Sequence, residues 1–226
     1  MLEELNDLIP NIMNKLPEFW QAILDFFIML GITGAVSFIF GTLFGVILTV
    51  TRRGDILENK VIYFILGKII DLFRAIPFVI LIFFLGPMTR IIAGTTIGLR
   101  GALFPLMVGT IPFFARQVES ALAEIDRGLI EASQAMGSSP MEIIFRVYLK
   151  ESIPGIIRAT TITLISLIGL ITMVGAVGGG GIGDFAIRYG YNSMQNDVTY
   201  VCVIILLLIT TTIQGVGNIL IRKTTH

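Results

Sequence analysis

Three stretches of this 226-residue chain contain no Asp, Glu, Lys or Arg and are long enough to cross a bilayer: residues 26–51, 159–183 and 198–221. A transmembrane helix needs about 20 consecutive, mostly apolar residues, so each stretch can span the hydrocarbon core. The whole chain is 54% hydrophobic and 14% charged, against about 25% charged residues in ordinary soluble domains. An all-α, polytopic membrane protein is therefore predicted.

Two shorter uncharged runs, 75–89 and 101–115, reach spanning length only when their charged neighbours are included. The first would carry Lys68, Asp71 and Arg74 into one end of a helix, where neighbouring charges at this spacing can pair. The second contains two prolines, which are tolerated where a helix packs on protein or lines a wet cavity. We predict a bundle of five transmembrane helices in one transmembrane domain (residues 1–226), with spans of about 20–50, 58–88, 97–118, 153–177 and 197–221.

The distribution of Lys and Arg predicts the orientation of these spans, because cytoplasmic loops carry an excess of both. Ten such residues fall in the loops on one side and four in those on the other. The C-terminus and the 119–152 loop are therefore expected in the cytoplasm and the N-terminus outside. Residues 2–18 carry apolar residues at helical spacing, which fits either an interfacial amphipathic helix or a loosely ordered terminus.

The first span contains small residues at every fourth position, Ser37, Gly41 and Gly45. Small residues at this spacing let two helices approach closely. Two partners fit the pattern: another helix of the same chain, which we favour, or a second copy of the chain.

The 119–152 loop has the sequence signals of two short helices. Residues 130–136 form the first candidate, and Gly137 fits the left-handed position that closes a helix. Ser139 can cap the second helix, with Pro140 at its first position and Glu142 at its third, which is the S-x-x-E capping box. A sharp turn between two capped helices is the predicted result.

Apolar residues follow the capping box at helical spacing on one face: Met141, Ile144, Phe145, Tyr148 and Leu149. Such a face outside the membrane either lies on lipid or docks into a groove of a soluble partner. Acidic residues flank it, and anionic lipid would repel them: Glu119, Glu124, Asp126, Glu131 and Glu151. The protein partner is therefore the favoured interpretation.

The same segment resembles the EAA loop of ABC importer permeases, whose pattern is EAA, three residues, Gly, nine residues and I-x-L-P. Here Glu131, Ala132 and Ser133 stand at its start, Gly137 at the glycine, Val147 at the isoleucine, Leu149 at the leucine and Lys150 at the proline. Lys150 departs from the pattern and predicts a differently shaped exit from the second helix. Residues 74–84 and 102–132 also resemble importer permeases, and 175–191 is similar to methionine importer permease subunits in particular.

This resemblance implies a type I ABC importer permease fold with cytoplasmic coupling helices, in a bacterial inner membrane. It implies two copies of the chain around the pore, two ATPase subunits that bind ATP and Mg²⁺, and an external binding lipoprotein that delivers D- or L-methionine. The coupling residues carried over are Glu131, Ala132, Ser133, Gly137, Ser139, Pro140, Met141, Ile144, Phe145 and Tyr148. Two rivals remain: a permease for a different amino acid, and a stand-alone secondary transporter or channel.

No catalytic residue, metal ligand or cofactor site is expected in this chain. It contains no G-x-x-x-x-G-K-[ST] motif, and its zero net charge gives no general attraction to nucleic acid. Gly178, Gly180 and Gly183 spell G-x-G-x-x-G, but a predicted transmembrane helix precedes them instead of the strand that nucleotide binding requires. The pore or gate candidates are Met173, Pro77 and Pro112, and the candidates for an external vestibule are Gly180, Gly183, Arg188 and Tyr191; ordinary packing is the alternative for each.

Overall fold

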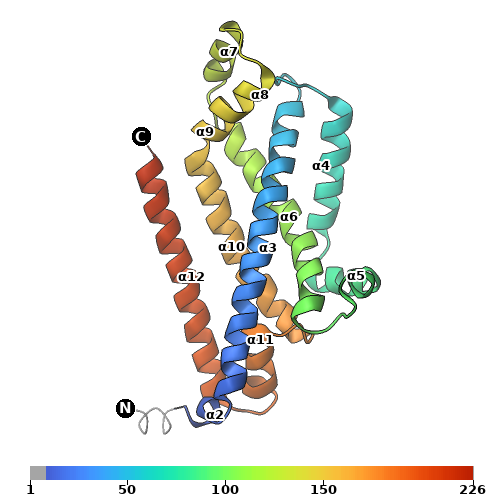
Figure 1. The fold of residues 1–226 in the computed structure, drawn as a ribbon, viewed down its shortest axis with the longest axis vertical. Coiled ribbons are helices and arrows are strands. Elements are labelled where there is room, and N and C mark those ends of the chain that lie inside the picture. Colours follow the sequence, from blue (N-terminus) through green and yellow to red (C-terminus); the bar gives the residue numbers. More distant parts are fainter. Residues whose placement is uncertain (1–8, 226) are drawn as a thin grey trace. The chain divides into compact units, whose positions relative to one another are not determined.

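The computed structural model describes residues 9–225, and all regular structure in this range is helical, as predicted. The elements in chain order are α2 (Pro10–Met13), α3 (Leu16–Thr51), α4 (Lys60–Ala75), α5 (Phe78–Ala93), α6 (Gly98–Ala123), α7 (Arg127–Ala135), α8 (Pro140–Ile143), the π-helix η1 (Ile144–Tyr148), α9 (Leu149–Glu151), α10 (Ile153–Ala176), α11 (Gly181–Phe185), the π-helix η2 (Ala186–Tyr191) and α12 (Asn196–Thr224) (Figure 1).

Within the described residues, four helices are long and apolar enough to cross a membrane: α3, α6, α10 and α12. Helices α4 and α5 pass the same test only as a bent pair, which makes a fifth candidate span. The break lies at Ile76, whose extended backbone (ψ 125°) is the conformation favoured before a proline, and at Pro77, which has no N–H to donate. The predicted single domain and the limits of its five spans stay predictions.

The chain divides into two compact units. One comprises the described residues up to Gly34, Pro77–Val108 and Leu164–Ile213; the other comprises Ala35–Ile76, Gly109–Thr163 and the described residues from Gln214 on. Four of the five limits between the units fall inside α3, α6, α10 and α12, so each of these helices contributes to both, and the fifth lies at the break between α4 and α5.

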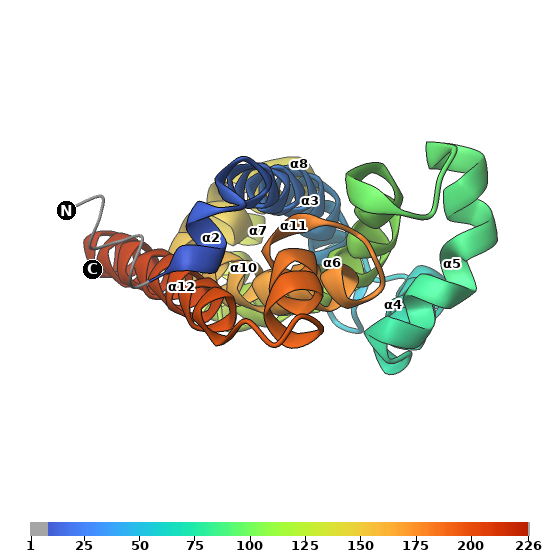
Figure 2. The same ribbon diagram turned by 90° about the horizontal axis from the view of Figure 1, so that it is seen from below.

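In the unit that contains α2, this short helix lies against the first turn of α12 (Figure 2). The backbone N–H and the side-chain amide of Asn11 both donate to the carboxylate of Asp197, at 3.1 and 3.0 Å. Ile12 is buried in the apolar core of the unit, with residues such as Phe26, Leu106, Leu167 and Val198. Part of the predicted amphipathic segment, residues 2–8, lies outside the described residues.

In the other unit, the small residues of α3 pack against α6. A Cβ atom on Gly41 would lie 2.6 Å from the Phe114 side chain, and one on Gly45 would lie 2.7 Å from Val118. Ser37, the first residue of the repeat, is buried. The prediction that these residues serve packing within the chain is confirmed.

Two charged residues of α4, Asp71 and Arg74, form ion pairs in the same unit. The Arg116 guanidinium of α6 binds the carboxylates of Asp71 at 2.9 Å and Glu119 at 2.6 Å, and Arg74 lies 3.6 Å from Asp71. Lys68 instead lies over the ring of Phe64. The predicted pairing along α4 is thus formed by Asp71 and Arg74, and Arg116 adds a link between α4 and α6 that the spacing within α4 could not show.

Candidate functional site

The segment between α6 and α10 folds into the predicted pair of short helices. Asp126 caps α7 by accepting a hydrogen bond from the Gly128 N–H at 2.9 Å. Helix α7 ends at Ala135, one residue before the predicted end, and Gly137 follows with φ +80°. A Cβ on Gly137 would meet nothing within 4 Å, so this glycine is required by its backbone conformation and not by close packing.

The predicted capping box at the start of α8 is confirmed. The Ser139 hydroxyl accepts from the Glu142 N–H at 3.4 Å, and the Glu142 carboxylate accepts from the Ser139 N–H at 2.9 Å. The backbone N–H and the hydroxyl of Ser139 both donate to the Glu142 carboxylate, at 2.9 Å each, and hold the pKa of this carboxyl below its ordinary value. Glu142 also forms the predicted i, i+4 pair with Arg146, at 3.7 Å. Pro140 occupies the first turn, where its missing N–H costs nothing.

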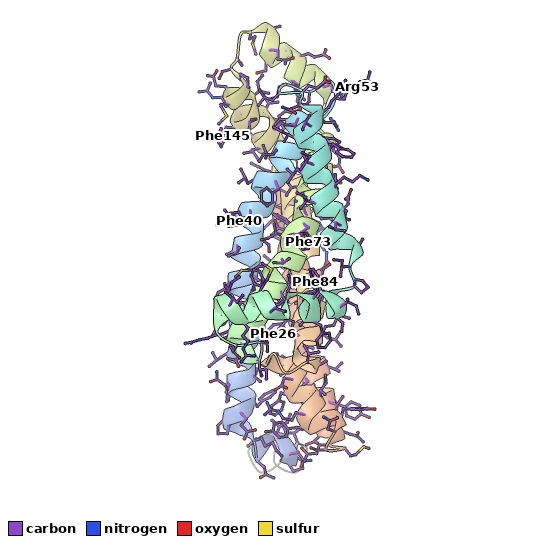
Figure 3. The ribbon with its side chains drawn as sticks, turned by 90° about the vertical axis from the view of Figure 1, so that its right-hand side faces the viewer. Phe26, Phe40, Arg53, Phe73, Phe84 and Phe145 are labelled. Carbon is purple, nitrogen blue, oxygen red and sulfur yellow. The ribbon has the colours of Figure 1, made fainter. Side chains whose placement is uncertain are left out.

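The apolar residues after the cap do not form the single stripe that was predicted. Ile144 and Tyr148 are buried, whereas Met141 and Phe145 are 59% and 61% exposed. Ile143, which the predicted stripe leaves out, is also buried, so the packed face of the segment is rotated away from Met141 and Phe145, and it continues through the π-helical turn η1. The second helix of the loop therefore has one apolar side packed inside the chain and another at the surface, where Phe145 points outward (Figure 3).

The buried side anchors the loop to the helices around it. Ile143, Ile144 and Tyr148 belong to an apolar cluster that also contains Val50 of α3, Phe114, Val118 and Leu122 of α6, and Ala159 of α10. Burying a large apolar side chain contributes about 1.5–3 kcal/mol relative to leaving it exposed, so three such residues hold the loop firmly. Lys150, which departs from the family pattern, lies in the short helix α9, and Pro154 falls in the first turn of α10.

The surface side carries several large apolar residues. Leu129, Met136, Met141 and Phe145 are all exposed, on α7, the turn, α8 and η1. Of the remaining predicted coupling residues, Glu131 and Ala132 are exposed on α7, whereas Ser133 is buried. The carbonyl of Ser133 accepts the Ser138 N–H at 3.1 Å, which helps to close the turn.

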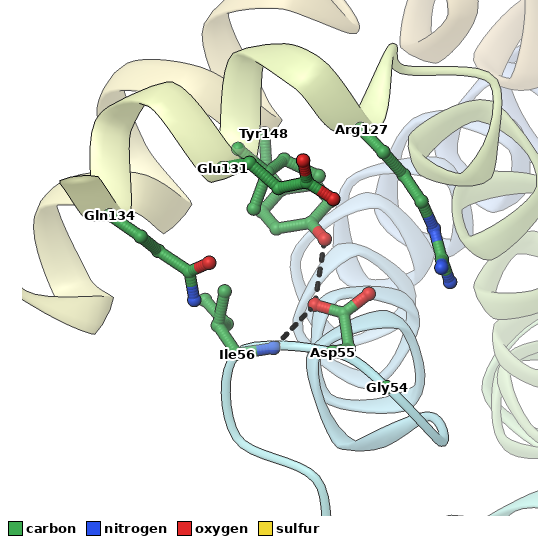
Figure 4. A pocket seen from close by; sticks show the side chains of 8 residues that line it. Gly54, Asp55, Ile56, Arg127, Glu131, Gln134 and Tyr148 are labelled. Atoms are coloured by element: carbon green, nitrogen blue, oxygen red, sulfur yellow. Dashed lines mark hydrogen bonds between the residues drawn. The ribbon is translucent and has the colours of Figure 1, made fainter.

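A small polar pocket lies beside α7, at the turn between α3 and α4 (Figure 4). Its lining residues are Gly54, Asp55, Ile56, Arg127, Ile130, Glu131, Gln134 and Tyr148. The Tyr148 hydroxyl donates to Asp55 Oδ1 at 2.7 Å, and burial together with this carboxylate raises the pKa of the Tyr148 phenol. Sequence reasoning missed Asp55, because no local signal in the turn points to a partner 93 residues away.

The acidic flanks are less available than predicted. Glu119 pairs with Arg116, Glu124 lies 3.8 Å from Arg158, and Asp126 caps α7. Three of these carboxylates are therefore already paired or hydrogen-bonded within the chain. The repulsion of anionic lipid is weaker than the sequence indicated. The exposed residues of this group are Glu124, Asp126, Glu131 and Glu151.

The candidate pore residues lie in different elements. Met173 is 46% exposed on α10, and Pro77 is exposed at the N-terminal end of α5. Pro112 is buried inside α6. Their role in a pore stays a prediction.

The glycine-rich segment breaks the helix, as expected from its sequence. Helix α10 ends at Ala176, and Gly178, Gly180 and Gly181 all have φ near +80°. A Cβ on Gly183 would collide with the backbone of Thr172, so this glycine allows α11 to lie against α10.

The other two vestibule candidates are exposed. The Arg188 guanidinium pairs with the Asp184 carboxylate and lies 5.1 Å from the centre of the Tyr189 ring. Tyr191 is 75% exposed. Their external role stays a prediction.

Comparison with known proteins places this architecture among transport proteins. Residues 41–226 match the family described as the binding-protein-dependent transport system inner membrane component. A probable D-methionine transport system permease protein MetI from Vibrio cholerae is 42% identical over 207 residues, which cover 92% of this chain and 90% of that protein. The D-methionine transport system permease protein MetI of Escherichia coli K12 is 50% identical over 133 residues, 59% of this chain and 61% of that protein.

A solved structure of the inward-facing MetNI methionine ABC transporter, in its native crystal form, contains a chain with the same fold. The TM-score is 0.91 at 42% identity, and the match covers 94% of this chain and 99% of that chain. The extent of these matches identifies the protein as a transport subunit and not as an enzyme with a reaction of its own. The chain belongs to the family of binding-protein-dependent transport system inner membrane components, the membrane permeases of ABC importers.

Proposed function

We propose that this chain is the membrane permease of an ATP-driven methionine importer. Two copies would enclose the pore, and an ATPase subunit would dock on the 119–152 loop of each. An external binding lipoprotein would deliver D- or L-methionine. ATP and Mg²⁺ would be bound by the ATPase, and this chain would supply the path and the coupling surface.

The observation that carries the proposal is the division of the loop into a buried and an exposed apolar side. Ile144 and Tyr148 fix the loop to the chain, whereas Met141 and Phe145 remain at the surface. Exposed apolar clusters on a soluble element are typical of protein interaction sites. An amphipathic helix of this kind can insert its apolar residues into a groove of a partner.

The other loop residues have distinct roles in this proposal. Gly137 provides the sharp turn, and the capping box of Ser139 and Glu142 keeps α8 folded outside the bundle. Glu131 is exposed on α7 and would offer its negative charge to a basic group of the ATPase. Ser133, being buried, would act on the turn and not on the partner.

The proposed orientation follows from the excess of Lys and Arg on the loop side and at the C-terminus, which favours the cytoplasm for both. The methionine assignment is supported by the names of the relatives, which are D-methionine permeases, and by the methionine transporter whose fold the chain shares. The rival substrates, other amino acids, differ from methionine in their side chains. Competition assays therefore discriminate between them.

The proposal is tested in proteoliposomes that contain the chain and its ATPase, with ATP inside and the binding protein with labelled methionine outside. We expect uptake that requires ATP, and Phe145→Asp should abolish it by placing a charge on the docking face. Phe145→Leu, which stays apolar, is the matched control and should retain uptake.

Gly137→Pro should also uncouple hydrolysis from transport by deforming the turn. Normal transport by both Phe145→Asp and Gly137→Pro would disprove the coupling role of the loop, and uptake driven by an ion gradient without ATP would disprove the importer.

A further inference from the structure

We propose that Asp55, in the turn between α3 and α4, is a positioning residue that transmits movement of the 119–152 loop to the helix bundle through Tyr148. The proposal rests on the proposed function, because it concerns how the docking loop is linked to the spans. It assigns a role to a residue that lies outside the EAA segment.

The contact between the two side chains is short and shielded from water. The Tyr148 hydroxyl lies 2.7 Å from Asp55 Oδ1, Tyr148 is 1% exposed, and the Asp55 carboxylate is 4% exposed. A hydrogen bond to an ionised acceptor in a low-dielectric environment is stronger than one between neutral groups. Tyr148 and Asp55 are therefore suited to move together when a force acts on the loop.

Asp55 is itself held by its own turn. Its Oδ1 also accepts the Ile56 N–H at 2.8 Å, and its Oδ2 lies 3.5 Å from the Arg52 guanidinium. Figure 4 shows the carboxylate between the Ile56 backbone and the Tyr148 hydroxyl. A carboxylate fixed on both oxygens cannot follow Tyr148 by rotating its side chain alone, so the backbone of the turn has to follow.

Hydrogen bonds fix the turn to both helices that it connects, α3 and α4. The Leu57 N–H donates to the Val50 carbonyl at 3.0 Å and the Asn59 N–H to the Thr51 carbonyl at 3.0 Å, which ties the turn to the end of α3. The Asn59 side chain caps α4 by accepting the N–H groups of Val61 and Ile62. Displacement of Asp55 would therefore reach the first turn of α4 directly.

Helix α4 continues the path, because Arg116 of α6 binds Asp71 of α4 at 2.9 Å and the Gly67 carbonyl at 3.2 Å. The resulting chain of contacts runs from the loop through Asp55 and α4 to α6, all within one compact unit. On the loop, the exposed Phe145 lies three residues before Tyr148 in the same π-helical turn. One turn thus carries both a residue offered to the partner and the residue that binds Asp55.

A purely structural hydrogen bond is the competing explanation, and it predicts a different outcome. Loss of a structural bond lowers the melting temperature and the amount of assembled complex. Loss of a positioning bond lowers the number of substrate molecules transported per ATP hydrolysed in the complexes that do assemble. This ratio is therefore the measurement to make.

The experiment compares Tyr148→Phe, Asp55→Ala and the double variant in complexes reconstituted with the ATPase and binding protein. We expect either single change to lower the ratio of methionine transported to ATP hydrolysed by about fivefold, the lower end of ordinary coupling between sites. The double variant should lose no more than the single variants, because the same link is broken. Asp55→Asn retains an oxygen acceptor and should restore most of the ratio, and Tyr200→Phe, at an exposed tyrosine, is the matched control.

An unchanged ratio in assembled Asp55→Ala and Tyr148→Phe complexes would overturn the proposal, as would losses that add in the double variant. If one single variant fails to assemble, the other breaks the same bond from the opposite side. Should both fail, Asp55→Asn becomes the deciding variant: the proposal requires an assembled complex with a near-normal ratio, and a fivefold loss there would overturn it. Failure of the proposed function would give a different result, because the unmodified chain would then show no ATP-dependent transport at all.

Discussion

The contact between α3 and α6 at Gly45 gives a sharp prediction for the substitution Gly45→Ala. A Cβ at this position would lie 2.7 Å from two atoms of the Val118 side chain and 2.8 Å from the Ala115 carbonyl oxygen. The first distance is about 0.8 Å shorter than the roughly 3.5 Å at the short end of favourable carbon–carbon contacts, so the two groups repel. The carbonyl oxygen belongs to the backbone of α6 and cannot rotate away, so the two helices must separate.

Overpacking of this kind typically costs about 1–3 kcal/mol. Alanine also favours the helix over glycine by about 1 kcal/mol, which would hide part of the cost. Gly31→Ala is the matched control, because it lies in the same helix and its new Cβ would meet nothing within 4 Å. The difference between the two variants isolates the steric clash.

The assay is thermal unfolding of the purified chain in detergent. For a chain of this size each kcal/mol shifts the melting temperature by about 2–4 °C, so Gly45→Ala should melt about 2–12 °C below Gly31→Ala. Equal melting temperatures for the two alanine variants would refute the close approach of α3 and α6 at this site.

Three further predictions concern the loop. Gly137→Ala forces a side chain into the left-handed conformation at a cost of about 1–2 kcal/mol, and should weaken binding of the ATPase, as measured by titration of the partner. Ser139→Ala removes the cap of α8, worth about 1 kcal/mol, and should speed amide exchange in α8 while exchange in α7 stays unchanged. The pKa of Tyr148 lies above the ordinary 10.0, so the contribution of the neutral hydroxyl to stability is complete below pH 10.0 and is lost only as the pH rises further. The difference in stability between the unmodified chain and Tyr148→Phe should therefore be constant from about pH 6 to 9. A fall of this difference within that range would contradict the assignment.

Local signals predicted the loop well. The capping box at Ser139 and the left-handed turn at Gly137 depend on interactions within four residues, and both occur as expected. The repeat of Gly41 and Gly45 also predicted close helix packing, because a small-residue pattern restricts what can lie beside it.

Two features could not be read from local spacing. The stripe of Met141, Ile144, Phe145 and Tyr148 was predicted from spacing alone, and the fold buries only Ile144 and Tyr148 of these four, together with Ile143. The bond between Asp55 and Tyr148 depends on the tertiary fold, since it joins a turn to a helix far away in the sequence. A polar residue in a turn is usually exposed to solvent. Nothing in the sequence around Asp55 indicates that its side chain is buried and bonded instead.

In the proposed importer, the energy of ATP hydrolysis enters this chain through the 119–152 loop. The decisive quantity is the number of methionine molecules taken up per ATP hydrolysed by proteoliposomes with the unmodified chain and with Phe145→Asp. We expect ATP-dependent uptake by the unmodified complex and a ratio near zero for the variant, with the Phe145→Leu complex close to normal. Equal ratios for the unmodified and Phe145→Asp complexes would show that the loop does not carry the coupling.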